Sequence, residues 1–133
     1  MDIILSLYPK NIEKIASGIK KFEFRRSIYK DKTVEKAYVY ATVPIKKIVA
    51  TFDILQIVEG TPEEIWDKCG QYSGSTKESL MDYFKGKNLV YALEVGNFEW
   101  LKKPIEPREY IDKFYPPQFF QYVDGKKVFN IKD

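Results

Sequence analysis

The sequence has no histidine, and Cys69 is the single cysteine among its 133 residues. Without histidine the chain lacks the usual general base near neutral pH and the commonest metal ligand. Ser-His-Asp and Cys-His catalysis are therefore excluded within this chain. An enzyme built on it has to use lysine, tyrosine, hydroxyl or carboxylate groups. We expect no metal and no cofactor, and we expect Cys69 to be a buried, inert thiol that forms no disulfide.

Long apolar runs are also absent. No stretch approaches the roughly 20 apolar residues that a membrane span needs. The first seven residues, Met-Asp-Ile-Ile-Leu-Ser-Leu, lack the basic region and the apolar run of a signal peptide. We therefore expect no membrane association and a reducing, cytoplasmic environment. The length suits a single domain over residues 1–133, and we expect a monomer or a weak dimer.

Positive charge is concentrated in one part of the chain. Residues 10–47 hold eleven Lys and Arg against four Asp and Glu, whereas the remainder holds eleven against fifteen. The basic segment thus carries +7 and the rest −4, for the net +3 of the whole chain. A basic segment on an otherwise acidic protein indicates an anionic partner such as nucleic acid or a nucleotide. A solvated lysine-rich surface is the alternative reading.

The pattern of apolar residues predicts short strands and helices. Residues 2–7 are typical of a buried strand, and residues 9–17 of an amphipathic helix that stops at Gly18. Strands are then predicted at 20–26, 36–42, 47–59 and 89–98. Thr61 to Glu64 and Ser75 to Glu78 each have the pattern of a capping box that opens a helix. Aromatic residues make up 16% of the chain, which favours a β-rich fold.

The C-terminal part is harder to interpret. Residues 104–121 are proline-rich and predicted to be irregular, with one helical turn near 107–112. Asp124-Gly125 is typical of a hairpin turn between strands at 121–123 and 128–130. Strands and helices do not alternate regularly along the chain, so a parallel Rossmann-like sheet is not expected. We predict an α+β fold, a small mixed or antiparallel β-barrel with flanking helices.

The strand at 20–26 carries the densest set of candidate functional residues. Its alternation places Phe22 and Phe24 on one face and Lys21, Glu23 and Arg25 on the other. Lys20 stands at the start of the strand, just after the glycine stop. An arginine fork suits a phosphate or a base edge, and a glutamate can accept from an amine or a hydroxyl. Compensating charges on an exposed strand face would explain the same pattern.

Further candidates lie on neighbouring segments. Because side chains alternate along a strand, Arg26 is expected on the same face as Phe22 and Phe24, unless a β-bulge turns it to the other face. Tyr40 either stacks on a base or fills the core, and Thr42 either contacts phosphate or belongs to an ordinary turn. Candidates from later segments of the chain are Tyr72, Ser73, Lys85 and Gln118.

The segment Gly18-Ile19-Lys20-Lys21-Phe22-Glu23-Phe24-Arg25 resembles the Gly-x-Lys-x-x-Glu-x-Arg signature of the ASCH family, whose fold is a PUA-like β-barrel. Similarity to this family continues in residues 4–15, 38–44, 83–87 and 116–119. The ordered set of segments is considerably more specific than the eight-residue motif. The relatives it resembles are archaeal and bacterial proteins described as predicted transcriptional regulators.

The resemblance implies recognition of RNA or a nucleotide in a cleft between the barrel and its helices. Some relatives hydrolyse an acylated amino group on a modified cytidine nucleoside, with a catalytic lysine that matches Lys20. The catalytic threonine of those relatives falls at Glu23, and this departure argues against the same activity. Other relatives cut single-stranded RNA.

Three functions remain open at the level of the sequence. The first is a module that binds RNA or a nucleotide, and its finer readings are recognition of a modified base or a role in the regulation of transcription or translation. The second is a hydrolase acting on RNA or nucleosides, with Lys20 as general base or electrostatic stabiliser and Glu23 as its acid/base partner. The nearby cations Lys21 and Arg25 would then lower the pKa of Lys20. The third is an adaptor whose basic segment meets an acidic protein.

Overall fold

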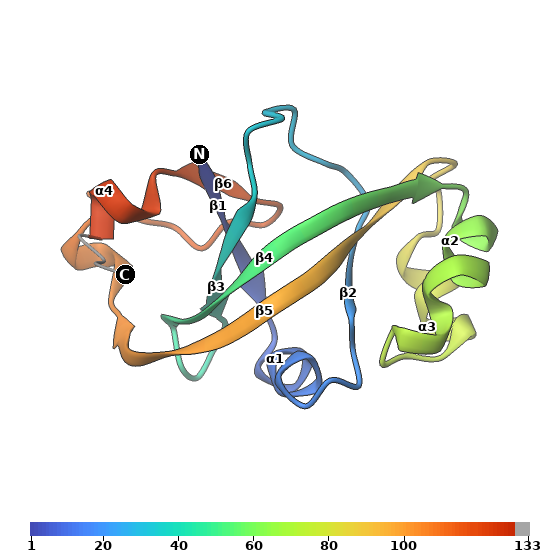
Figure 1. Cartoon of the computed structure of the whole chain (residues 1–133), viewed down its shortest axis with the longest axis horizontal. Coiled ribbons are helices and arrows are strands. Elements are labelled where there is room, and N and C mark those ends of the chain that lie inside the picture. The colour runs from blue at the N-terminus through green and yellow to red at the C-terminus, as the bar shows by residue number, and fades with distance from the viewer. Residues whose placement is uncertain (130–133) are drawn as a thin grey trace.

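The computed structural model describes residues 1–129, which form one mixed sheet with helices at its ends and on its faces (Figure 1). The elements, in chain order, are β1 (Asp2–Leu7), α1 (Pro9–Ala16), β2 (Phe22–Arg25), β3 (Lys36–Ala41), β4 (Lys47–Gly60), α2 (Pro62–Cys69), η1 (Gly70–Tyr72), α3 (Lys77–Tyr83), β5 (Val90–Ile105), η2 (Pro107–Glu109), β6 (Gln121–Val123) and α4 (Gly125–Phe129). The expected α+β class is confirmed.

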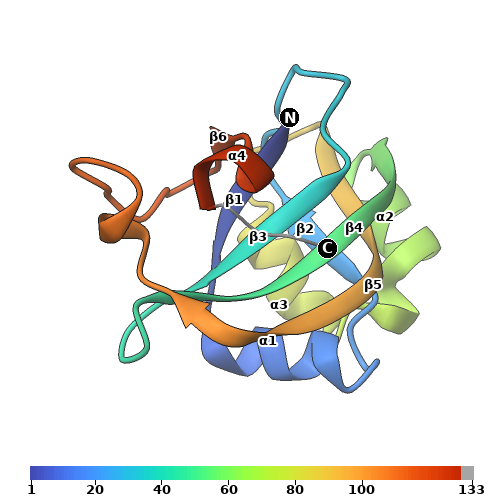
Figure 2. The same cartoon turned by 60° about the vertical axis from the view of Figure 1, so that its left-hand side comes forward.

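The sheet has six strands in the order β2-β5-β4-β3-β1-β6. β1 and β3 pair in parallel, and the other neighbouring strands pair antiparallel. The long strands β4 and β5 curl the sheet into a barrel-like shape, which Figure 2 shows from the side. In the described residues β2 and β6 form its two edges, so the hydrogen-bonded ladder is not closed.

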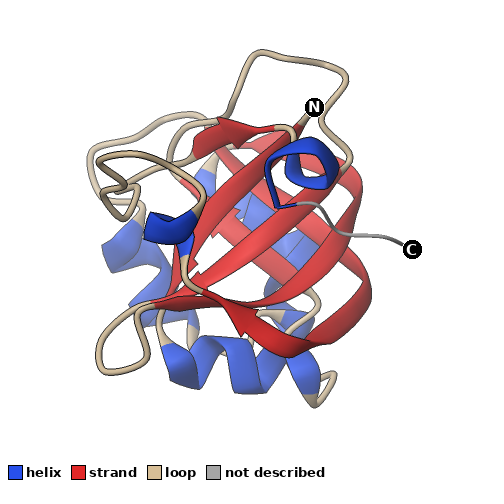
Figure 3. Ribbon diagram, turned by 90° about the vertical axis from the view of Figure 1, so that its left-hand side faces the viewer, coloured by secondary structure: helices blue, strands red, loops and turns tan. Residues whose placement is uncertain are grey.

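Both faces of the sheet are covered, as the ribbon in Figure 3 illustrates. On one face Leu5, Val39 and Phe52 pack with Ile12 and Ile15 of α1. On the other, α2 and α3 cover β2 and β5, and the chain from residue 105 onward covers β1 and β3. Each strand is therefore buried on both sides where these segments lie, which explains why β1 and β3 read as nearly continuous apolar runs.

The first half of the chain folds close to expectation. Pro9 lies in the first turn of α1, and Gly18 ends that helix region with a φ of +83°, a conformation glycine adopts without strain. The capping box at Thr61 and Glu64 is present. Cys69 is buried and burial raises the pKa of its thiol, as expected for an inert cysteine. In residues 1–129 no helix is long and apolar enough to cross a membrane.

Three local predictions were wrong. The helix α3 is capped by Thr76, whose hydroxyl accepts from the Ser79 N–H at 3.1 Å, and not by a capping box at Ser75. β5 runs on to Ile105, seven residues beyond the predicted end at 98, because its second half pairs with β4. The third error is the predicted C-terminal hairpin.

Gly125 starts the helix α4 instead of turning a hairpin. Its N–H donates to a carboxylate oxygen of Asp2 at 2.9 Å, and Asp2 also pairs with Val123. β6 therefore takes β1 as its partner, and no second hairpin strand is needed. Asn130, the last residue of that predicted strand, lies outside the described residues.

Candidate functional site

Lys20 is positioned by the backbone turn that follows α1. The Gly18 N–H donates to Ile15 O at 3.1 Å, and the Lys20 N–H donates to Lys14 O at 3.0 Å. The turn reverses the chain out of the helix and delivers it to the start of β2. The spacing of glycine and lysine in the motif therefore fixes where the lysine side chain leaves the backbone.

The Lys20 side chain is buried, with 7% of its surface exposed. Its ammonium donates to the main-chain carbonyl of Ser73 at 3.3 Å and lies 4.7 Å from the ring centroid of Phe24. Burial lowers the pKa of Lys20, Glu23 partly offsets this, and Lys14 lowers it further. A lysine whose pKa falls carries a larger neutral fraction, which is what a general base or a nucleophile requires.

Glu23 is buried to the same degree, with 7% exposed. In the sheet register Glu23 faces Leu93 of β5, which in turn faces Ile57 of β4, so the three side chains share one face. Its Oε2 atom is buried without a hydrogen-bond partner. A buried carboxylate oxygen with no partner costs free energy, so it marks a position that local stability alone does not explain.

Lys20 and Glu23 are close enough to affect each other electrostatically, yet they form no direct ion pair within residues 1–129. The sequence left two interpretations for Glu23, a ligand-binding cleft and an exposed strand face with compensating charges, and its burial does not fit the exposed face. Phe22 and Phe24 pack under α2 and α3 on one side, while the side of Glu23 turns toward Leu93. Both faces of β2 are thereby covered, and the pair sits below the surface.

The remaining cations around β2 meet aromatic residues or backbone carbonyls from distant segments. The ammonium of Lys21 lies 4.5 Å from the ring centroid of Tyr72. Arg25 donates to the carbonyl of Phe119, whose ring is 55% exposed. Arg26 donates to the carbonyl of Lys85 at 3.2 Å. β2 thus gathers segments that lie more than 45 residues away in the chain.

Tyr83 completes this set from the helix α3. Its hydroxyl donates to the carbonyl of Phe24 at 3.3 Å, while part of its ring stays exposed. Burial raises the pKa of the Tyr83 hydroxyl, with Arg25 acting in the opposite direction. We call the partly exposed cations and rings around this strand the β2 surface, which consists of Lys21, Arg25, Arg26, Tyr72, Tyr83 and Phe119.

Most of the residues singled out from the sequence lie at or beside this surface. Ser73 lies next to Lys20, and its hydroxyl donates to the main-chain carbonyl of Gly70 at 2.8 Å. Lys85 adjoins Arg26, and Gln118 is exposed one residue before Phe119. The motif strand therefore brings together Lys20, Lys21, Glu23, Arg25, Arg26, Tyr72, Ser73, Lys85 and Gln118.

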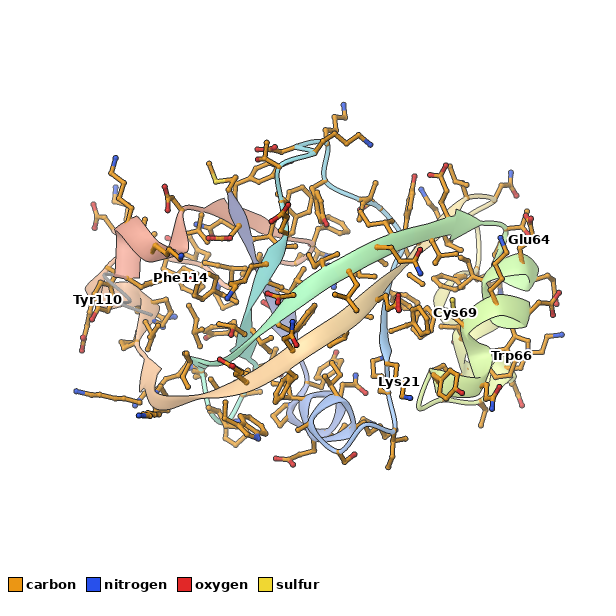
Figure 4. All side chains as sticks on the ribbon, in the orientation of Figure 1. Lys21, Glu64, Trp66, Cys69, Tyr110 and Phe114 are labelled. Atoms are coloured by element: carbon orange, nitrogen blue, oxygen red, sulfur yellow. The ribbon has the colours of Figure 1, made fainter. Side chains whose placement is uncertain are left out.

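Tyr40 and Thr42 do not lie at the β2 surface, and this corrects their place among the candidate ligand-binding residues. Tyr40 is 1% exposed and its ring packs 5.4 Å from that of Phe114, so it is a core residue and no platform for a base. The hydroxyl of Thr42 is likewise buried, which removes it from contact with a phosphate. In Figure 4 Phe114 lies toward the left end of the molecule, whereas Lys21 lies to the right of its centre.

Comparison with known proteins identifies the family. A family model described as a domain of unknown function, DUF365, matches residues 3–114. The chain belongs to this family. The DUF365 protein is 28% identical, over 92% of its own length and 84% of the relative, to an ASCH domain-containing ribonuclease of Zymomonas mobilis.

Solved structures agree with this relationship. The crystal structure of the Zymomonas mobilis ASCH protein matches with a TM-score of 0.86 at 26% identity, covering 96% of this chain and 91% of that one. A single-residue variant of the same protein, tyrosine to phenylalanine, gives a TM-score of 0.87 at 25% identity, covering 97% and 94%. The DUF365 protein thus has the ASCH fold, as the sequence motif had indicated.

Sequence reasoning missed four residues of the site. Lys14 donates from its ammonium to Gly74 O at 2.8 Å and acts on the pKa of Lys20, although its place in the helix pattern gave no sign of this. Phe24 was placed only on the strand face opposite Lys21, Glu23 and Arg25, and Tyr83 was not among the candidates. Phe119 lies in the proline-rich segment predicted to be irregular, and only the fold shows that this segment reaches Arg25.

Proposed function

We propose that this DUF365 protein binds RNA, or a nucleotide, across the β2 surface. The observation that carries the proposal is the interleaving of cations with exposed rings. Lys21 lies against Tyr72, Arg25 against the segment of Phe119, and Tyr83 is hydrogen-bonded to β2 itself. The name of the Zymomonas mobilis relative, a ribonuclease, supports the same class of ligand.

The physical basis is the one by which proteins hold single strands. Cations follow the phosphates and release counterions, while exposed rings stack on bases. Each stacked base contributes about 1–3 kcal/mol by alanine substitution, and stacking tolerates any sequence. The three rings of the β2 surface are between 39% and 55% exposed, so each can present a face to a base.

Fluorescence anisotropy with a labelled single-stranded RNA of about 12 nucleotides tests the proposal. We expect measurable affinity at 50 mM salt that falls steeply as salt rises, since phosphate contacts dominate such binding. Lys21→Ala should weaken binding and reduce the slope of log K against log salt by about 0.7–1. Lys102→Ala, at the far end of β5, is the matched control and should leave both unchanged.

Absence of binding to RNA, DNA and nucleotides at low salt would remove the proposal. An equal loss of RNA affinity in Lys21→Ala and Lys102→Ala would show that RNA does not bind specifically at β2. A protein-interaction role predicts a different result, namely capture of an acidic protein that survives nuclease treatment.

A second candidate function is cleavage of the bound RNA, and the depressed pKa of Lys20 favours it. Neutral Lys20 would take the proton of the attacking hydroxyl, either from water or from a ribose 2′-OH. The new P–O bond forms as the bond from phosphorus to the leaving 5′-oxygen breaks. In this reading Glu23 supplies the proton that the leaving 5′-oxygen takes up.

Labelled RNA incubated with the wild type, Lys20→Met and Glu23→Gln decides between binding and cleavage. Cleavage predicts product from the wild type and loss of at least a hundredfold in rate in Lys20→Met, the usual scale for a general base. Equal background cleavage with all three proteins would reject the cleavage function, and RNA binding would remain as the proposed function. We place either activity in the cytoplasm, and a role in transcription or translation would follow from binding without cleavage.

A further inference from the structure

A cavity of about 340 Å³ lies between the 27–34 loop and the strands β4 and β5. Its walls include Tyr29, Val34, Ile57, Glu59 and Tyr91, with Asp31 and Lys32 from the loop. This volume falls at the lower end of the range typical of small-ligand sites. Neither Lys20 nor Glu23 lines it, so it is distinct from the buried pair.

The sheet register connects this cavity to the β2 surface. Arg25 faces Tyr91 on β5, and Tyr91 faces Glu59 on β4. Directly opposed residues of antiparallel strands project from the same face, so Arg25 stands beside the wall formed by Tyr91 and Glu59. A chain of nucleotides held by Arg25 can therefore reach into the cavity with one base.

Tyr29 is the buried polar group of this cavity. It is 7% exposed, and its hydroxyl has no hydrogen-bond partner. Burial raises the pKa of Tyr29 to about 12, with Tyr122 adding to the shift, so the hydroxyl keeps its proton throughout the physiological range. An unpaired buried donor is costly in the free protein, and a ligand acceptor would satisfy it.

The charges on the walls decide which part of a nucleotide enters. Asp31 and Glu59 outnumber Lys32, so the cavity disfavours a phosphate. Hydrogen bonds from Thr33 lower the pKa of Asp31, which is therefore ionised at neutral pH. A carboxylate such as Glu59 accepts well from the exocyclic amine of a base, and the ring of Tyr91 offers an apolar surface beside it.

We infer that this cavity receives one base of the bound RNA and selects bases that carry an exocyclic amino group. Glu59 accepts from the amine, Tyr29 donates to an acceptor on the base, and Arg25 contacts the adjoining phosphate. Arg25 already donates to Phe119 O, yet a guanidinium has five N–H donors and retains others for a phosphate. The inference rests on the proposed RNA binding and adds a base preference to it.

Nucleosides test the cavity apart from the phosphate contacts, because they carry no charge. Two pairs differ in the exocyclic amine, adenosine against inosine and cytidine against uridine. Titration of ¹⁵N-labelled protein should show that the amino member of each pair binds about tenfold more tightly, the scale of one base-edge contact. The shifted amides should be those of residues 29–34, 57–59 and 91.

Two variants sharpen the test. Glu59→Gln presents a donor as well as an acceptor, so it should abolish the preference within each pair. Glu99→Gln, an exposed glutamate elsewhere on β5, is its control and should keep the preference. Tyr29→Phe should weaken nucleoside binding while leaving the protein at least as stable as the wild type, since it removes an unpartnered hydroxyl.

The outcomes separate the two proposals. Equal binding within each pair, or a preference that survives in Glu59→Gln, overturns the inference even if RNA binds. RNA binding with no nucleoside response at residues 29–34 also overturns it and leaves the proposed function standing. A nucleoside preference that depends on Glu59, without binding of RNA oligonucleotides, would show a base site in the cavity but would overturn both its part in RNA binding and the proposed β2 surface.

Discussion

The ammonium of Lys20 donates to the carbonyl of Ser73, which lies 53 residues later in the chain. This contact joins the start of β2 to the link between α2 and α3. Gly74, the next residue, has a φ of +66°, and a Cβ there would come within 3.2 Å of Lys20 Cβ and 3.3 Å of Lys14 Cδ. The link therefore depends on a glycine that both accepts the backbone angle and leaves room for two lysines.

Gly74→Ala should consequently cost more stability than the backbone strain alone. Gly86 is the matched control, because its φ is +87° and nothing lies within 4 Å of a Cβ added there. We expect Gly86→Ala to lose about 1–2 kcal/mol from the left-handed conformation, and Gly74→Ala to lose more and to weaken RNA binding. Urea unfolding measures the first effect and anisotropy the second. Equal losses in the two variants would contradict the close packing at Lys20.

The lowered pKa of Lys20 predicts how stability changes with pH. Between the lowered value in the folded protein and the ordinary value of 10.5, the unfolded chain binds more protons at this residue. The free energy of unfolding contributed by Lys20 therefore rises as pH increases through this window. Comparison with Lys20→Met isolates the effect, because other groups titrate in both proteins.

We expect the wild type to gain stability relative to Lys20→Met between pH 7 and pH 10, measured by urea unfolding at several pH values. A stability difference that stays constant over this range would show that the Lys20 pKa is the same in the folded and unfolded chain. A difference that falls would mean that the pKa is raised.

Glu23 opposes the effect of burial on Lys20, and this can be measured directly. Removing its charge in Glu23→Gln should lower the pKa of Lys20 further, because the favourable interaction with the ammonium is lost. The ¹³Cε chemical shift of Lys20, followed against pH by NMR, reports its protonation. Glu94→Gln, on a neighbouring strand position that faces Phe22, serves as the control. An unchanged or raised pKa in Glu23→Gln would show that Glu23 does not stabilise the charged form of Lys20.

The exposed rings should contribute separately from the charges. Tyr72→Ala is expected to weaken RNA binding about fivefold to a hundredfold, with little change in salt slope, since stacking releases no counterions. Trp100 is a comparably exposed ring on β5, and Trp100→Ala should leave RNA affinity unchanged. A salt slope that changes in Tyr72→Ala would mean that this ring acts mainly by positioning Lys21.

The sequence predicts much of the fold because local signals agree with it. The helix stop at Gly18, the alternation of β2 and the capping box at Thr61 are each short-range features, and each appears in the structure. The motif strand was therefore located correctly. Its parity was also correct, since Glu23 and Arg25 do share one face.

What the sequence misses depends on tertiary partners. Alternation shows that two faces of a strand differ, but not that both are covered, so it left open whether Glu23 lies on an exposed face or is buried. Tyr40 has the same local pattern whether it faces solvent or Phe114. Gly125 is typical of a turn, and no local pattern shows that its N–H donates to the carboxylate of Asp2 at the other end of the chain. The cavity beside Tyr29 combines a loop with two distant strands, and no local pattern indicates it.

Amide chemical-shift mapping with a short single-stranded RNA tests the central claim most directly. Binding at the β2 surface predicts that the largest shifts fall on residues 20–26, 72–74, 83–85 and 118–119, segments joined in space only by this fold. Shifts confined to other parts of the chain, such as the far half of β5 around Trp100 and Lys102, would contradict the account.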